Sequence, residues 1–248
     1  MIALDGFPIV RPGGDVAAII VDAVARMGLA LRDFDILVIA QKIVSKAEGR
    51  LSDLAQIDPS PEAIELAERT GKAPALCAAI LGESNAILRA KHGVVICEHR
   101  SGHVMANAGI DHSNTDGSGD GTVVLLPNDA DASAEAIRKG LAAHYGAEIG
   151  VIISDSLGRA WRLGTVGHAI GAAGIPSIID RRGTPDLNGR PLEVTMIGFA
   201  DAVAAAGVLL MGEGDEGRPV VLVRGLRWAA PVLPVKALRR PIEDDMFR

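Results

Sequence analysis

The sequence predicts an α+β fold. The chain has 248 residues, enough for one large domain or two small ones with a substantial core. Patterns typical of helices and of buried strands follow one another without the regular alternation of a doubly wound sheet. Hydrophobic residues make up 48% of the chain but aromatic residues only 3%, so aliphatic side chains must form the core. We therefore expect a mixed helix and strand fold that can divide into two lobes.

Helices are predicted where a capping residue precedes an apolar repeat. Asp15 follows two glycines and caps a helix that continues to about Met27. Ser60 and Pro61 begin a second helix, since serine caps and proline suits the first turn. Gly71 ends it, because glycine adopts the left-handed conformation of a helix stop. Further helices are expected at residues 74–81, 132–144 and 201–210.

Short apolar runs predict the buried strands. They lie at residues 36–40, 94–97, 123–126, 151–153, 177–179 and 220–223. Four glycines, at 164, 167, 171 and 174, lack the spacing of a dinucleotide-binding fingerprint. Close packing of backbone is the favoured interpretation of these glycines, ahead of an approach to phosphate.

Composition argues against several functions. The formal net charge of −6 and the few aromatic residues give no footprint for nucleic acid. The two cysteines form no framework and fit a reducing cytosol. The first residues lack the basic and apolar regions of a signal peptide, and no uncharged run approaches the roughly 20 residues of a membrane span. We expect a cytoplasmic protein without nucleic-acid or membrane partners.

Two acidic motifs indicate metal-assisted phosphoryl chemistry. Asp111 lies in Asn107-Ala-Gly-Ile-Asp111-His-Ser-Asn114, and Asp155-Ser156 ends an apolar run where a strand should give way to a loop. Carboxylates with neighbouring hydroxyl and amide oxygens suit a hard divalent cation that shares its ligands with phosphate. Arg159 and Arg162 follow and are candidates to clamp phosphate or carboxylate.

Other motifs are open to two interpretations. No P-loop, H-E-x-x-H or G-x-S-x-G motif occurs. Cys97, His99 and His103 supply only three zinc ligands, so an exposed turn between strands is favoured over a metal site. Lysines 42 and 46 suit either phosphate neutralisation or a solvated helix face. The glycine-rich segment 212–217 suits either a turn around a nucleotide or a solvent-facing loop.

Taken in order, the motifs resemble those of the coenzyme F420-0:L-glutamate ligases, which append glutamates to the deazaflavin coenzyme F420. The resemblance covers essentially the whole chain. It runs through Gly6-Phe-Pro8, Ala40-Gln-Lys-Ile-Val-Ser-Lys-Ala-Glu-Gly-Arg50, Asn107 to Asn114, Ser154-Asp-Ser-Leu-Gly-Arg-Ala-Trp-Arg162, Asp186-Leu-Asn-Gly-Arg190 and the tail from Arg240 to Arg248.

The resemblance implies a GTP-dependent ligase that needs two divalent metals, Mg²⁺ or Mn²⁺, with K⁺ as a further candidate cation. In that family GTP phosphorylates the terminal carboxylate of F420-0, and the α-amine of L-glutamate attacks the acyl phosphate. A second addition forms a γ-glutamyl bond. Cations are needed because an anionic carboxylate must approach a triphosphate.

The resemblance also assigns roles by position. Asp111 and Asp155 are expected to bind the first metal, and Ser156 and Glu213 the second. Arg159 and Arg162 are our own candidates for anionic groups of the coenzyme or glutamate. Nucleotide contacts are expected from Phe7, Pro8, Ile9, Val10, Ala40, Gln41, Lys46, Asn114, Met211, Gly212, Glu213, Gly214, Asp215, Glu216, Gly217 and Arg218.

One catalytic domain over residues 1–248 is implied, in an α+β fold and an intertwined homodimer, without the C-terminal flavin-reductase domain of some actinobacterial relatives. Two alternatives remain. A metal-dependent phosphotransferase or phosphohydrolase acting on another small carboxylate or phosphate would use the same acidic groups. A non-catalytic nucleotide-binding or assembly protein is less favoured, because it would not need them.

Overall fold

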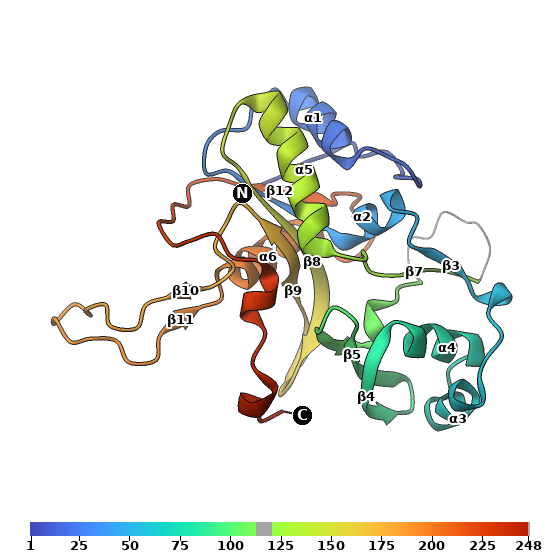
Figure 1. Cartoon of the computed structure of the whole chain (residues 1–248). Coiled ribbons are helices and arrows are strands. Elements are labelled where there is room, and N and C mark those ends of the chain that lie inside the picture. The colour runs from blue at the N-terminus through green and yellow to red at the C-terminus, as the bar shows by residue number, and fades with distance from the viewer. Residues whose placement is uncertain (113–120, 248) are drawn as a thin grey trace.

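A five-stranded mixed sheet forms the centre of the computed structural model, which describes residues 1–112 and 121–247 (Figure 1). Parallel pairing joins β2 to β8, and the other neighbours pair antiparallel. In spatial order the strands are β1 (Ile2–Ala3), β12 (Val220–Val223), β2 (Ile36–Ala40), β8 (Gly150–Arg159) and β9 (Arg162–Ala173).

Helices cover both faces of this sheet. On one face α1 (Val16–Arg26) and α5 (Ala130–Tyr145) pack against Leu37, Ile39 and Ile153. On the other face α6 (Phe199–Met211) packs against Val38 and Ile152. Side chains alternate between the faces of a strand, so β2 and residues 150–153 of β8 are apolar because both of their faces are covered. The fold class is α+β, as predicted.

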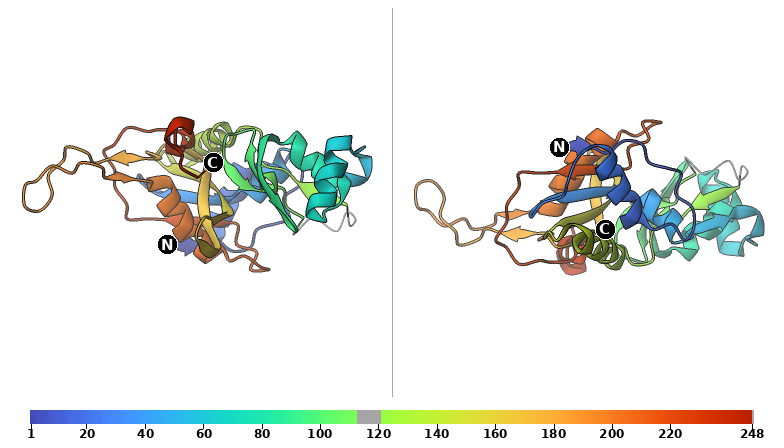
Figure 2. Two further views of the ribbon diagram at one scale, coloured as in Figure 1. Left: turned by 90° about the horizontal axis from the view of Figure 1, so that it is seen from below. Right: turned by 90° about the horizontal axis from the view of Figure 1, so that it is seen from above.

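A smaller unit follows the short helix α2 (Gln41–Ala47) and lies at the end of the molecule opposite the arm of β10 (Ile179–Asp180) and β11 (Met196–Ile197) (Figure 2). Buried side chains from its helices and strands form a separate core. The unit contains α3 (Pro61–Thr70), α4 (Pro74–Gly82), β4 (Ser84–Lys91), β5 (Val94–His99) and β6 (Val104–Ala106), and β3 (Leu51–Asp53) pairs with β7 (Thr122–Val124) beside it.

The predicted helix signals are confirmed. The carboxylate of Asp15 accepts from the backbone N–H of Ala18 at 3.0 Å, and Ser60 caps α3 in the same way through Ala63. Gly71 ends α3 in the left-handed conformation with φ of 70°. At these two helix starts the side-chain acceptor satisfies a backbone N–H that has no partner within the helix.

Three local predictions are wrong. The strand β8 does not end at Ile153 but continues to Arg159, because it pairs with the long strand β9 that the sequence pattern hid. The predicted strand at 177–179 is irregular except for Ile179 in β10. The stretch from Cys97 to His103 is not simply an exposed turn, since Cys97 and His99 are buried in β5 and only residues 100–103 form the turn.

Close packing explains the glycines of β9, as the sequence suggested. A Cβ on Gly167 would lie 2.6 Å from the backbone oxygen of Ala204 in α6. A Cβ on Gly171 would lie 2.3 Å from Ala130 in α5. Both separations are far below van der Waals contact, so glycine lets helices on opposite faces approach the same strand.

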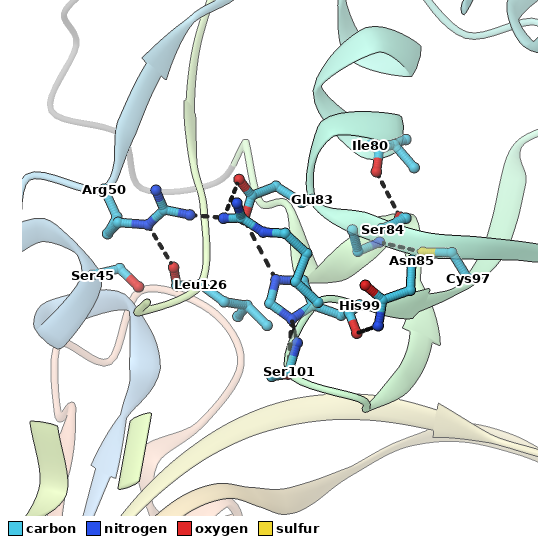
Figure 3. A network of polar contacts seen from close by, with 12 residues as sticks. Ser45, Arg50, Ile80, Glu83, Ser84, Asn85, Cys97, His99, Ser101 and Leu126 are labelled. Carbon is cyan, nitrogen blue, oxygen red and sulfur yellow. Dashed lines mark hydrogen bonds and ion pairs between the residues drawn. The ribbon is translucent and has the colours of Figure 1, made fainter. Parts of the chain in front are cut away.

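A buried ionic cluster joins the smaller unit to the segment that follows α2 (Figure 3). Glu83 is 8% exposed and accepts from Arg50 at 2.7 Å and from Arg100 at 2.8 Å. The Nε2 atom of His99 lies 3.5 Å from the same carboxylate, and the Nε of Arg50 also donates to the backbone oxygen of Leu126. Arg50 therefore ties the end of α4 to the region of α2 and β7.

The charge of Glu83 is maintained by these partners. Burial acts to raise the pKa of Glu83, but the nearby His99 ring and the positive charges of Arg50 and Arg100 outweigh it, so this pKa falls below its ordinary value of 4.5. A carboxyl group with a depressed pKa in the folded state stabilises the fold above its unfolded pKa. That contribution is lost as the pH falls through the lower, folded value.

We expect Glu83→Gln to destabilise the protein by about 2 kcal/mol at pH 7, because two arginines lose their anionic partner in a mostly buried site. The loss should shrink as the pH falls below 4.5 in chemical denaturation curves. Glu65→Gln, at an exposed position on α3, is the matched control and should change little. Equal stability of Glu83→Gln and wild type at pH 7 would contradict this role.

Within the two described segments of the chain, no helix has the length and apolar character needed to cross a membrane.

Candidate active site

A cavity of about 800 Å³ opens at the carboxyl end of the parallel pair β2 and β8. Four segments distant in sequence supply most of its wall: residues 7–10, residues 40–46 at the start of α2, residues 154–156 of β8, and residues 208–219 from the end of α6 onward. Asp111 and Thr165 complete the wall. Ligands bind preferentially at this edge of open sheets with parallel strands, because loops and helix starts gather there.

The helix α2 brings polar side chains to the cavity directly after the buried strand β2. Gln41 and Lys46 line it and are 3% and 7% exposed. The hydroxyl of Ser45 donates to the amide oxygen of Gln41 at 2.8 Å, which fixes the orientation of that side chain. The Nζ atom of Lys42 lies 2.7 Å from a carboxylate oxygen of Asp111. The cavity wall therefore carries two lysines.

The backbone of Asp111 is fixed by the neighbouring strand β7. Its N–H donates to the oxygen of Val124 at 3.0 Å, and its own oxygen accepts from Val124 at 2.8 Å. The next residue, Leu125, donates to the oxygen of Arg50 at 2.9 Å. Asp111 is thus paired with Val124, and Leu125 joins the same segment to Arg50, the residue that binds Glu83.

Asp155 and Ser156 lie on β8 and meet the loop after α6. The N–H of Ser156 donates to Asp155 at 2.9 Å, and its hydroxyl donates to Glu213 at 2.6 Å. Burial raises the pKa of Asp155 to about 7; the Ser156 hydrogen bond and Lys42 oppose that rise, while Asp111 and Glu213 add to it. Repulsion among three carboxylates at one cavity favours a bound cation.

The loop after α6 is shaped by glycine. Gly212 has φ of 78°, and a Cβ there would lie 2.1 Å from the carboxyl group of Glu216. Glu216 accepts from the N–H of Gly214 at 2.9 Å, while Arg218 binds Asp5 at 2.9 Å. The tight turn predicted for this segment therefore curls around one of its own carboxylates and presents Glu213 to Ser156.

Most of the predicted site residues line this one cavity. They are Phe7, Pro8, Ile9, Val10, Ala40, Gln41, Lys46, Asp111, Asp155, Ser156 and the whole segment from Met211 to Arg218. Arg159 and Arg162 do not line it. Arg159 lies further along the hairpin of β8 and β9 and donates to the oxygen of Gly164 at 3.1 Å, and Arg162 is exposed. Asn114 lies outside the described residues.

Several lining residues had no assigned role in the sequence. The sequence makes Lys42 only one of two candidates to neutralise phosphate. It does not predict the pairing of Lys42 with Asp111, because the two residues are far apart in the chain. Thr165 and Val208 also line the cavity. Thr165 lies in β9, a strand whose glycines masked its pattern, whereas Val208 follows the apolar repeat of α6 and could have been inferred from it.

Fold and cavity together define an α+β protein with an acidic, lysine-bearing pocket at the edge of a mixed sheet. The chain belongs to the F420-0:Gamma-glutamyl ligase family, whose profile matches residues 6–225.

Named relatives match along nearly the full length. The Coenzyme F420:L-glutamate ligase of Methanothermobacter thermautotrophicus is 50% identical over 250 residues, covering 100% of this chain and 98% of the relative. The protein of the same name from Methanopyrus kandleri is 45% identical and covers 96% and 93% of the two chains. That from Archaeoglobus fulgidus is 40% identical and covers 99% and 94%.

Proposed function

We propose that this protein joins L-glutamate to coenzyme F420-0 in a GTP-dependent reaction with an acyl-phosphate intermediate, and then adds a γ-linked glutamate. Family membership and the names of the relatives support the ligation itself. The observation that carries the nucleotide assignment is the convergence of the expected site residues on the 800 Å³ cavity. Apart from Asn114, which lies outside the described residues, residues expected to contact GTP and those expected to bind cations line it together, although they come from five separate parts of the chain.

The donor set fits two divalent cations when the nucleotide completes it. Asp111 and Asp155 would hold one cation, and Ser156 and Glu213 the other. Among the described residues, no three His, Cys, Asp or Glu side chains group closely enough to hold a metal by themselves. Hard cations near phosphates take the remaining ligands from phosphate oxygens and water, so two protein ligands each are sufficient. Bound Mg²⁺ or Mn²⁺ would neutralise the charge on the phosphates and on the attacking carboxylate.

Residues of the chain supply binding and positioning. Lys42 and Lys46 would neutralise phosphate charge, and the buried amide of Gln41, held by Ser45, would orient the nucleotide. A carboxylate oxygen of F420-0 attacks the γ-phosphorus as the bond to GDP breaks. The amine of glutamate then attacks the acyl carbon, loses a proton, and phosphate leaves with that carboxylate oxygen. Holding the reactants in line supplies much of the acceleration.

The proposal includes the expected homodimer, which exposed apolar side chains near the tips of two projecting hairpins support. Leu163, in the hairpin of β8 and β9, is 99% exposed, and Leu187, in the turn of the arm formed by β10 and β11, is fully exposed. Light scattering of the purified protein measures the mass, and a monomer at assay concentration would refute this part.

Isotope transfer tests the mechanism. With ¹⁸O in the terminal carboxylate of F420-0, we expect one ¹⁸O atom in the phosphate released with the first amide bond, as measured by mass spectrometry. The second addition activates the unlabelled γ-carboxylate of the first glutamate and should release unlabelled phosphate. Unlabelled phosphate from the first addition would refute the acyl phosphate. Phosphate release from GTP without glutamate addition would favour the phosphohydrolase or phosphotransferase alternative.

A further inference from the structure

A second cavity, of about 150 Å³, lies beyond the candidate active site along the same strand pair. Leu157 of β8 and His168 of β9 form part of its wall. His103 comes from the turn before β6, Asp201 from the first turn of α6, and Arg239 from the segment that follows Val235–Leu238. Four parts of the chain thus converge on a small polar space that none of the roles assigned above uses.

The second cavity lies close to Asp155. In the antiparallel pair of β8 and β9, Asp155 is directly opposite His168. Leu157 follows Asp155 by two residues, so both side chains leave the same face of β8, about 7 Å apart along the strand. The wall of the second cavity therefore begins roughly 7 Å along β8 from the residue that we assign to the reacting phosphate region.

The polar groups of this cavity are only partly satisfied by the protein. Asp201 accepts the N–H of Ala169 at 2.9 Å through Oδ1, and its Oδ2 makes no hydrogen bond with any residue that the structure describes. Arg239 uses Nη1 to donate to the backbone oxygen of Ser101, and among the described residues its Nε and Nη2 have no acceptor. One carboxylate oxygen and two guanidinium donors remain for a ligand.

Two histidines complete the polar wall of this cavity. The Nδ1 atom of His168 lies 3.0 Å from the oxygen of Val166, and a carbonyl only accepts, so Nδ1 carries a proton. Burial, and next the charge of Arg239, lower the pKa of His103, which keeps this ring neutral at pH 7. Arg239 and Asp201 thus bring one guanidinium and one carboxylate to the same cavity.

We propose that this second cavity binds the incoming α-amino acid, L-glutamate, with a carboxylate on Arg239 and the ammonium group on Asp201. The proposal rests on the proposed ligase function. One fixed cation and one fixed anion match a zwitterion better than a simple anion. The volume equals that of roughly five water molecules in bulk liquid, which suits a small amino acid and excludes a nucleotide or a deazaflavin.

Two variants and a deaminated analogue test the assignment. Arg239→Gln and Asp201→Asn should each raise the KM for L-glutamate about tenfold or more, with the KM for GTP changed less than twofold. Asparagine keeps the Oδ1 acceptor for Ala169, so the fold is preserved. Glutarate lacks the amine, so Arg239→Gln should weaken its inhibition about tenfold while Asp201→Asn should not. Arg240→Gln, an exposed neighbour, is the control and should behave as wild type.

The outcomes separate this inference from the ligase proposal. A wild type that forms no glutamylated product refutes the ligase function, and calorimetric titration with L-glutamate then tests the cavity directly on the same variants. A wild type that forms product, with an unchanged glutamate KM in both variants, overturns the cavity assignment alone. Weaker binding of inorganic phosphate to Arg239→Gln, with unchanged glutamate binding, would make the cavity an anion site and would also overturn it.

Discussion

Asp155→Asn should lower the kcat of glutamate ligation by about 10³-fold and leave the fold intact. The substitution keeps the shape of the side chain and the oxygen that accepts from Ser156, but removes the charge that would hold a cation.

The same substitution should raise the stability of the metal-free protein at neutral and alkaline pH. Burial raises the pKa of Asp155 from 3.8 to about 7, so the folded state favours the protonated form. The metal-free wild type therefore loses stability as the pH rises from about 4 to 7, and asparagine removes this loss. We expect metal-free Asp155→Asn to be the more stable protein at pH 8 and the difference to vanish near pH 4.

Thermal unfolding with and without Mn²⁺ measures both effects, together with the turnover assay. Asp22→Asn, at an exposed position on α1, is the matched control. Stabilisation of Asp155→Asn by Mn²⁺ and GTP equal to that of wild type, with retained turnover, would contradict the assignment of Asp155.

Lys46→Met should weaken GTP binding about 100-fold, close to 3 kcal/mol. Lys46 is 7% exposed and lines the large cavity, where a positive charge shielded from water acts strongly on phosphate. Methionine keeps most of the apolar stem, so the loss should come from the charge and not from packing.

A titration with a fluorescent GTP analogue measures this affinity. Lys139→Met is the matched control, since Lys139 is 71% exposed on α5, and its affinity should equal that of wild type. Unchanged binding by Lys46→Met would remove this lysine from the nucleotide site and leave Lys42 as the candidate.

Local signals in the sequence predicted the helices better than the strands. Asp15, Ser60 and Gly71 act through hydrogen bonds and backbone angles within a few residues, so their meaning does not depend on the rest of the fold. The strand β9 was missed because Gly167 and Gly171 are there for helices that pack from elsewhere in the chain. Its partner β8 was consequently ended too early.

In the site, too, local motifs were predictable and contacts between distant segments were not. Motifs indicated Asp111, Asp155, Ser156 and Glu213 as candidates, but nothing local indicated that Lys42 pairs with Asp111 or that Ser156 donates to Glu213. Arg159 and Arg162 share the motif of Asp155, yet they lie further along the hairpin, away from the residues that line the cavity. Proximity in sequence is a poor guide along an extended strand, because each residue advances about 3.3 Å.

Mass spectrometry of F420-0 incubated with the protein, GTP, Mn²⁺ and L-glutamate is the most direct test of the proposed function, with a control that omits GTP. We predict glutamate-sized mass additions that require GTP and that show how many residues are added. Hydrolysis of GTP without any mass addition, or additions that are equally fast without GTP, would contradict the GTP-dependent ligase.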